Sequence, residues 1–241
     1  MIDLAVNAAG ELWAVSAHDV YQLDISSAPG TVHCAATYAL PAGSATFYGL
    51  TFAPAGVIDP NSEVLVAADT AGELWALEIV AGSVQLTQHG TFGTVPANDG
   101  HGNTYANAGK PWELSGDIAF FSRNGSNVGL ATVRDCPNPP SATGCSTTDT
   151  LVEIDLSLVA TAGTQAVIQS VIGQIVKAPT CSDAAHTSYG SLYGIATNGT
   201  DVFGFSHAGN IVQVSTLDGS GCLLQSIASD LWVGAASTSA L

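Results

Sequence analysis

Two polar stretches of the chain contain side chains that can bind a ligand. The first, Asn98-Asp-Gly-His-Gly-Asn103, combines a carboxylate, an imidazole and two amides, and aromatic residues follow it at positions 105 and 112. The second, residues 181–189, carries another carboxylate, imidazole and phenol. Aromatic rings stack on sugars and on peptide side chains, while polar neighbours fix the orientation of the ligand. The candidate ligand-binding residues are therefore Tyr105, Trp112, His101, His186 and Tyr189.

The same stretches offer ligands for a divalent metal ion. Carboxylate oxygens and imidazole nitrogens both coordinate such ions. The candidates are Asp99, His101, Asp183 and His186, although their spacing matches neither an EF-hand nor a zinc motif. Nothing in the sequence fixes the distances between them. Further polar residues recur in the second-to-third turns, at His18, Asp69, Asp135 and His207, but such turn residues more often satisfy backbone groups than bind ions. No other cofactor is expected.

The composition excludes several classes of partner. Twenty acidic residues against four basic ones give the 241-residue chain a net charge of −16. This charge repels nucleic-acid phosphates, so we expect no nucleic-acid binding; it serves either solubility or the attraction of cations and basic partners. No apolar run reaches the ~18 to 20 residues that span a bilayer, and Met1-Ile-Asp-Leu lacks the basic start of a signal peptide.

The five cysteines indicate disulfide chemistry. Cys136 and Cys145 flank a proline-rich stretch that can form neither a helix nor a regular strand, so we expect a disulfide to close this loop. Three cysteines then remain, Cys34, Cys181 and Cys222, and at least one must be free or bonded to another chain. We expect the protein to be extracellular, periplasmic or on the cell surface.

A repeated β unit must position these loops. Four times the chain gives an apolar strand, a small turn, a second strand, a polar turn and a third strand of alternating type, such as Leu151-Val-Glu-Ile-Asp-Leu. Weaker fourth strands follow at about 32–40, 84–90, 167–175 and 222–228, and a short helix within 160–176 is an alternative for the third of these. Four antiparallel strands per repeat are typical of a propeller blade. We predict one all-β domain over 1–241, with repeats at about 1–43, 44–93, 113–177 and 191–230 and a closing strand at 231–236.

Similar strand motifs recur along the chain, at Gly49-Leu-Thr-Phe, Gly72-Glu-Leu-Trp-Ala-Leu, Leu151-Val-Glu-Ile-Asp155 and Tyr193-Gly-Ile-Ala-Thr. They resemble the motif of bacterial secreted β-propellers, whose blades carry Gly-Leu-Ala-Phe, a turn, Gly-x-Leu-Tyr-x-Val and Leu-Tyr-x-Ile-Asp. The resemblance covers nearly the whole chain, but its motif is structural. The class that it implies includes lectins, lyases, lactonases and scaffolds.

Ring closure is the open question of this fold. First strands begin near residues 2, 48, 115, 193 and 232, so a fifth first strand has no blade of its own. Proteins normally cover or pair such open edges. We favour a β-propeller of four blades plus a C-terminal clasp strand. The alternative is five blades with an incomplete last blade.

Catalysis has no motif in this chain. Gly-x-Ser-x-Gly, His-Glu-x-x-His and a phosphate-binding glycine-rich loop are all absent. A lactonase-like propeller would need acidic and amide ligands around an axial metal, and only Asp3 and Asp117 lie in predicted first strands. A metal-dependent hydrolase or lyase is therefore an alternative and not the leading hypothesis.

Three long connections are predicted to lie on one face. Residues 94–114 and 178–191 link a fourth strand to a first strand, and residues 135–149 link a second to a third. In an up-and-down blade both kinds of connection lie at the same end. Long connections are often functional, although they can also simply cap the core. We expect a noncatalytic extracellular binding or scaffold propeller that uses this face for a protein or glycan partner, or, alternatively, a self-associating structural subunit of a cell-surface assembly.

Overall fold

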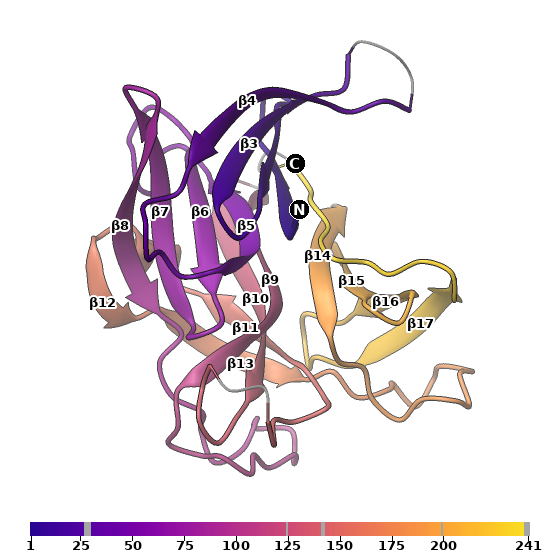
Figure 1. Cartoon of the computed structure of the whole chain (residues 1–241). Coiled ribbons are helices and arrows are strands. Elements are labelled where there is room, and N and C mark those ends of the chain that lie inside the picture. The colour runs from indigo at the N-terminus through magenta and orange to yellow at the C-terminus, as the bar shows by residue number, and fades with distance from the viewer. Residues whose placement is uncertain (27–29, 124, 141–142, 199, 239–241) are drawn as a thin grey trace.

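The computed structural model describes residues 1–26, 30–123, 125–140, 143–198 and 200–238, and its regular structure is almost all β-strand (Figure 1). Four antiparallel sheets are arranged as a four-bladed β-propeller, which confirms the predicted fold class. Strands that follow one another in the chain are neighbours in each blade, because short turns join most of them. No helix among the described residues is long and apolar enough to cross a membrane.

Each blade has four strands, and the first strand of each is the innermost. Blade 1 contains β1 (Asp3–Val6), β2 (Leu12–Val15), β3 (Asp19–Asp24) and β4 (His33–Ala39). Blade 2 contains β5 (Phe47–Ala53), β6 (Val64–Asp69), β7 (Glu73–Val80) and β8 (Ser83–Thr91). Blade 3 contains β9 (Trp112–Arg123), β10 (Ser126–Asp135), β11 (Thr150–Ile154) and β13 (Ile168–Gln174). Blade 4 contains β14 (Leu192–Asn198), β15 (Asp201–Ser206), β16 (Asn210–Val214) and β17 (Gly221–Ser226).

The segment between β11 and β13 departs from the simple repeat. A short helix, α1 (Leu156–Val159), begins where the Asp155 carboxylate accepts a hydrogen bond from the backbone N–H of Ser157. The next strand, β12 (Gly163–Ala166), pairs in parallel with β8 of blade 2. The predicted fourth strand at 167–175 is present as β13. The alternative of a short helix within 160–176 is wrong, because that range contains β12 and β13 and α1 ends before it.

Buried aspartates tie neighbouring blades together at the axis. Asp3 and Asp117 occupy the repeat position at which blades 2 and 4 have Gly49 and Gly194. Asp3 Oδ2 accepts a hydrogen bond from the backbone N–H of Leu50 in β5, at 2.5 Å. Asp117 Oδ2 accepts one from the N–H of Ile195 in β14, at 2.7 Å. Each carboxylate therefore fastens its own blade to the next one.

Apolar side chains fill three of the four interfaces between blades. One cluster lies between blades 1 and 2, a second between blades 2 and 3, and a third between blades 3 and 4. Burial of these side chains is the main force that holds blade to blade. The interface between blades 4 and 1 is built differently.

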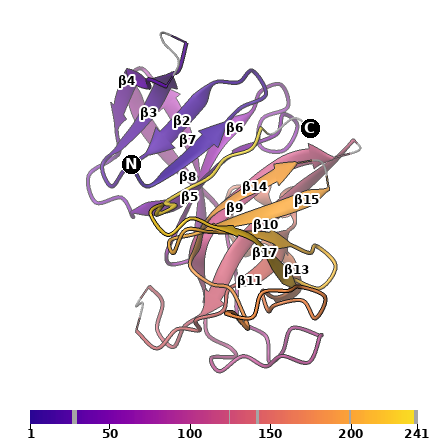
Figure 2. The ribbon, with the colours of Figure 1, turned by 90° about the vertical axis from the view of Figure 1, so that its right-hand side faces the viewer.

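The C-terminal segment 231–238 closes the ring between β14 and β1 (Figures 1 and 2). Thr238 forms a parallel bridge with Val6, and the Ser237 hydroxyl lies 3.1 Å from that of Thr197 in β14. Gly234 packs directly against the Asp3 carboxyl group. The ring thus has four blades and a clasp. The clasp is irregular, however: the strand expected at 231–236 is not formed, because the described segment pairs only at Thr238.

Candidate functional site

The three long connections lie at one end of the propeller and contact one another (lower part of Figure 1). The backbone N–H of Asn107 in the first connection donates to Asp135 Oδ2 at the start of the second, at 3.1 Å. The N–H of Asp149 donates to the Tyr189 carbonyl of the third, at 3.0 Å. The predicted segments 94–114, 135–149 and 178–191, here called the loop face, therefore form one continuous layer. Its first segment ends earlier than predicted, because β9 already begins at Trp112.

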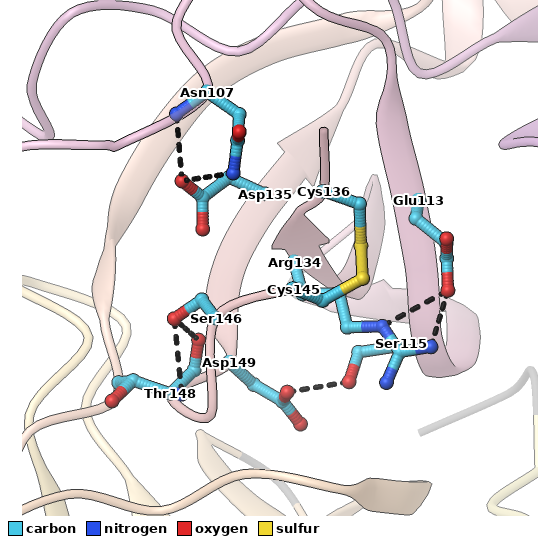
Figure 3. The surroundings of a disulfide bond; sticks show 10 residues. All are labelled: Asn107, Glu113, Ser115, Arg134, Asp135, Cys136, Cys145, Ser146, Thr148 and Asp149. Carbon is cyan, nitrogen blue, oxygen red and sulfur yellow. Dashed lines mark hydrogen bonds and ion pairs between the residues drawn. A yellow bond between two sulfur atoms is a disulfide. The ribbon is translucent and has the colours of Figure 1, made fainter. Parts of the chain in front are cut away.

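Two disulfides brace the loop face, and one of them fastens it to a blade. The expected bond between Cys136 and Cys145 is present and closes the second connection (Figure 3). A second bond joins Cys181 of the third connection to Cys222 in β17, a pairing that the sequence left open. Cys34, in β4, is exposed and free. The two disulfides are consistent with an oxidising, extracytoplasmic location.

A buried ion pair lies beside the Cys136–Cys145 bond (Figure 3). The Arg134 guanidinium donates through Nε and Nη2 to Glu113 Oε1. Glu113 is 1% exposed, so the carboxylate depends on this partner for compensation of its charge. The pair joins β9 to β10 at the end where the second connection begins.

A second buried carboxylate links blade 3 to blade 4 beneath the loop face. Asp149 accepts hydrogen bonds from the Ser115 hydroxyl and from the backbone N–H of Leu192, the latter at 2.8 Å. Burial raises the pKa of Asp149, although these hydrogen bonds and the charge of Arg134 oppose the shift. The group therefore positions the first residue of β14.

Three of the candidate aromatic residues are buried under the loops. Tyr105, Trp112 and Tyr189 are 7%, 1% and 3% exposed. The Tyr105 and Trp112 rings meet edge to face at 5.1 Å, and the Tyr105 hydroxyl lies 3.2 Å from the Thr150 hydroxyl. Burial raises the pKa of Tyr105 to about 12. In this structure the rings therefore anchor the loop face and do not present a stacking surface to a ligand.

The two candidate histidines lie on different connections. His101 is exposed and follows Asp99, whose Oδ1 accepts hydrogen bonds from the backbone N–H groups of His101 and Asn103. Partial burial raises the pKa of Asp99, but these hydrogen bonds lower it by more, so the pKa lies below its usual value. His186 Nδ1 lies 2.6 Å from Asp183 Oδ2 in the third connection.

The four metal-ligand candidates are not brought together. Asp183 and His186 contact each other, whereas the Asp99 oxygens bond to the backbone and to Asn103. Among the residues that the structure describes, the one group of three or more clustered His, Cys, Asp or Glu ligands is Glu113 with Cys136 and Cys145. The sulfurs of that group form a disulfide, and its carboxylate pairs with Arg134. The arrangement therefore suits a covalently braced surface better than a metal centre.

A cavity that the sequence reasoning missed opens at the centre of the same end. It has a volume of about 260 Å³ and is lined by Met1, Ile2, Tyr48, Tyr193, His207 and Val233. The tyrosines stand at the second positions of β5 and β14, where both repeats read Tyr-Gly. That recurring Tyr-Gly pair is the sequence signal from which the cavity could be predicted.

Comparisons with known proteins add little to this picture. No protein-family model matches the chain, and no curated protein sequence matches it. Among solved structures, it is similar to PorZ of Porphyromonas gingivalis, an essential bacterial surface component of the type-IX secretion system. The identity is 14% and the TM-score 0.33, over 93% of this chain and 28% of the PorZ chain. This chain therefore spans little more than a quarter of the length of that protein.

Proposed function

We propose that the protein is a noncatalytic binding or scaffold propeller that acts outside the cytoplasm through its loop face, residues 94–114, 135–149 and 178–191. The observation that carries the proposal is the bracing of that face. Hydrogen bonds join its three connections to one another, and two disulfides tie the second and third in place. A surface that is ordered before it meets a partner loses less conformational entropy on binding.

The partner that suits this face is a protein or a glycan without strong negative charge. The chain carries a net charge of −16, which favours basic or neutral partners. His101 and His186 are the candidate residues that remain within reach of such a partner, since His101 is exposed and the side chain of His186 is 33% exposed. Tyr105, Trp112 and Tyr189 would act indirectly, by holding the loops in shape.

A double variant of the two histidines tests the proposal. We expect His101→Ala/His186→Ala to weaken binding on a glycan array or to immobilised extracellular proteins, with the fold unchanged. The matched control is Asn61→Ala, an exposed residue in the connection between β5 and β6, at the opposite end of the propeller. If binding persists in the double variant and disappears in the control, the binding surface lies at the opposite end of the propeller and the proposal is wrong.

An assembly subunit is the second candidate function. The outer strand of blade 1, β4, has no strand beyond it among the described residues, and residues 33–35, including Cys34, are exposed. Unpaired edges can pair with another chain. Sedimentation with and without reductant, for the parent protein and for Cys34→Ser, tests this role: a monomer in all four samples at high concentration contradicts it.

A further inference from the structure

We propose that the central cavity at the loop-face end binds a single neutral sugar ring, held between Tyr48, Tyr193 and His207. This inference rests on the proposed binding role of that end, and it names the ligand chemistry and the residues. None of the lining residues belongs to the three connections of the loop face. The two ideas can therefore fail separately.

The cavity lies where the inner strands begin. Tyr48 and Tyr193 come from β5 and β14, Ile2 directly precedes β1, and His207 directly follows β15. Val233 of the clasp completes the wall on the side between blades 4 and 1. Fourth-to-first and second-to-third connections both meet this end of a blade, so the cavity opens at the centre of the loop-face end.

The lining combines ring surfaces with polar groups. The Tyr193 and His207 rings stand edge to face, 5.5 Å apart. Within the described part of the chain, the hydroxyls of Tyr48 and Tyr193 and the ring nitrogens of His207 make no hydrogen bond to another protein group. The remaining lining is aliphatic. Such a wall suits a ligand that has apolar faces and hydrogen-bonding edges.

Charge and polarity disfavour anionic and wholly apolar ligands. No Lys, Arg, Asp or Glu side chain lines the cavity, and the net charge of −16 repels anions. A wholly apolar ligand would cover the phenol and imidazole groups without satisfying them, which lowers affinity. A pyranose presents C–H faces to the rings and hydroxyls to the three polar groups.

The size of the cavity limits the ligand to one ring. Its volume of about 260 Å³ lies below the roughly 300 to 1,000 Å³ of sites that enclose drug-sized molecules. The next layer along the axis is filled, because Asp3 contacts β5 and Gly234 packs against the Asp3 carboxyl. The cavity is therefore a shallow bowl that would accept the terminal residue of a glycan and not a stretch of its chain.

The test uses the whole protein and a panel of methyl pyranosides, including methyl α-D-glucopyranoside, methyl α-D-mannopyranoside and methyl β-D-galactopyranoside. We expect saturation-transfer NMR to detect at least one of them, with a Kd on the order of 1 to 10 mM. Tyr48→Leu and Tyr193→Leu should each weaken this binding roughly tenfold, because each removes one ring surface. Tyr193→Phe keeps the ring and should lose less. Near-UV circular dichroism checks that each variant is folded.

Two control ligands and one control variant decide the outcome. Cyclohexanol has a similar ring with one hydroxyl, and N-acetyl-phenylalanine amide carries an apolar protein side chain. If either binds this cavity as tightly as the methyl pyranosides or more tightly, the assignment to a sugar is wrong. Absence of binding for every pyranoside also overturns it. Glycan binding that is lost in His101→Ala/His186→Ala but kept in both tyrosine variants overturns this inference and leaves the proposed function standing. Glycan binding that is lost in both tyrosine variants but kept in His101→Ala/His186→Ala supports sugar binding in the cavity and contradicts the proposed role of the loop face.

Discussion

At the scale of single residues, the buried axial carboxyl groups make stability depend on pH. Burial raises the pKa of Asp3 well above its usual value, and the charge of Asp117 and a hydrogen bond with it raise the pKa further. Burial likewise raises the pKa of Asp117 to about 7, although hydrogen bonds, the first from Asp3, oppose the shift. The folded protein therefore binds protons in a range in which the unfolded chain has released them.

The free energy of unfolding is expected to fall as the pH rises. Between the unfolded value near 3.8 and the folded value near 7, the folded state holds the extra proton, so raising the pH favours unfolding. Urea unfolding from about pH 4 to pH 8 measures this, and Asp3→Asn should flatten the profile by removing one ionisable group of the pair. An equally steep profile in Asp3→Asn would contradict the assignment.

The ion pair of Arg134 and Glu113 gives a second prediction at this scale. Replacing Arg134 by Met leaves a nearly fully buried carboxylate without its partner, which should cost about 3 to 5 kcal/mol of unfolding free energy. The double variant Arg134→Met/Glu113→Leu should recover much of that loss, because the uncompensated charge is gone. Chemical denaturation of the two variants measures the difference. If both variants lose the same unfolding free energy, packing around the ion pair, and not its charge, determines the stability.

At the scale of elements, the two disulfides should differ in their effect. Cys181 and Cys222 are 41 residues apart, whereas Cys136 and Cys145 are 9 apart. Closing the longer loop restricts the unfolded chain more. Cys181→Ser/Cys222→Ser should therefore lower the free energy of unfolding by about 4 kcal/mol, and Cys136→Ser/Cys145→Ser by about 2.6 kcal/mol. Thermal unfolding of both variants measures this order. A larger loss for the shorter loop would point to strain relief or lost packing instead.

The strands show what sequence pattern can and cannot predict. The strand β16 alternates between buried and half-buried residues and pairs with its neighbours in the chain, so its period and the adjoining turn residues are enough to predict it. The strand β12 was missed because its partner, β8, belongs to another blade and no local pattern encodes that pairing. Tyr105, Trp112 and Tyr189 were predicted as ligand-binding residues. Their burial could not be predicted, because it depends on how three distant connections fold together.

At the scale of the whole molecule, the clasp is expected to control ring integrity. A side chain at Gly234 would collide with the Asp3 carboxyl group. Gly234→Val should therefore displace the segment from between β14 and β1, lower the melting temperature and expose edges that promote self-association. Ala is the milder matched substitution at the same place. Differential scanning calorimetry and light scattering measure both effects, and a Val variant as stable and monomeric as the parent would show that the clasp is dispensable.

The clasp also makes the interface between blades 4 and 1 the last one to form. Three interfaces between blades can fill while the polypeptide is still being synthesised, because each uses apolar residues already translated. The last joint needs residues 231–238 against β1, so it cannot form until all four blades and the clasp have been translated. Until then the open edges of β1 and β14 are available for pairing with another chain.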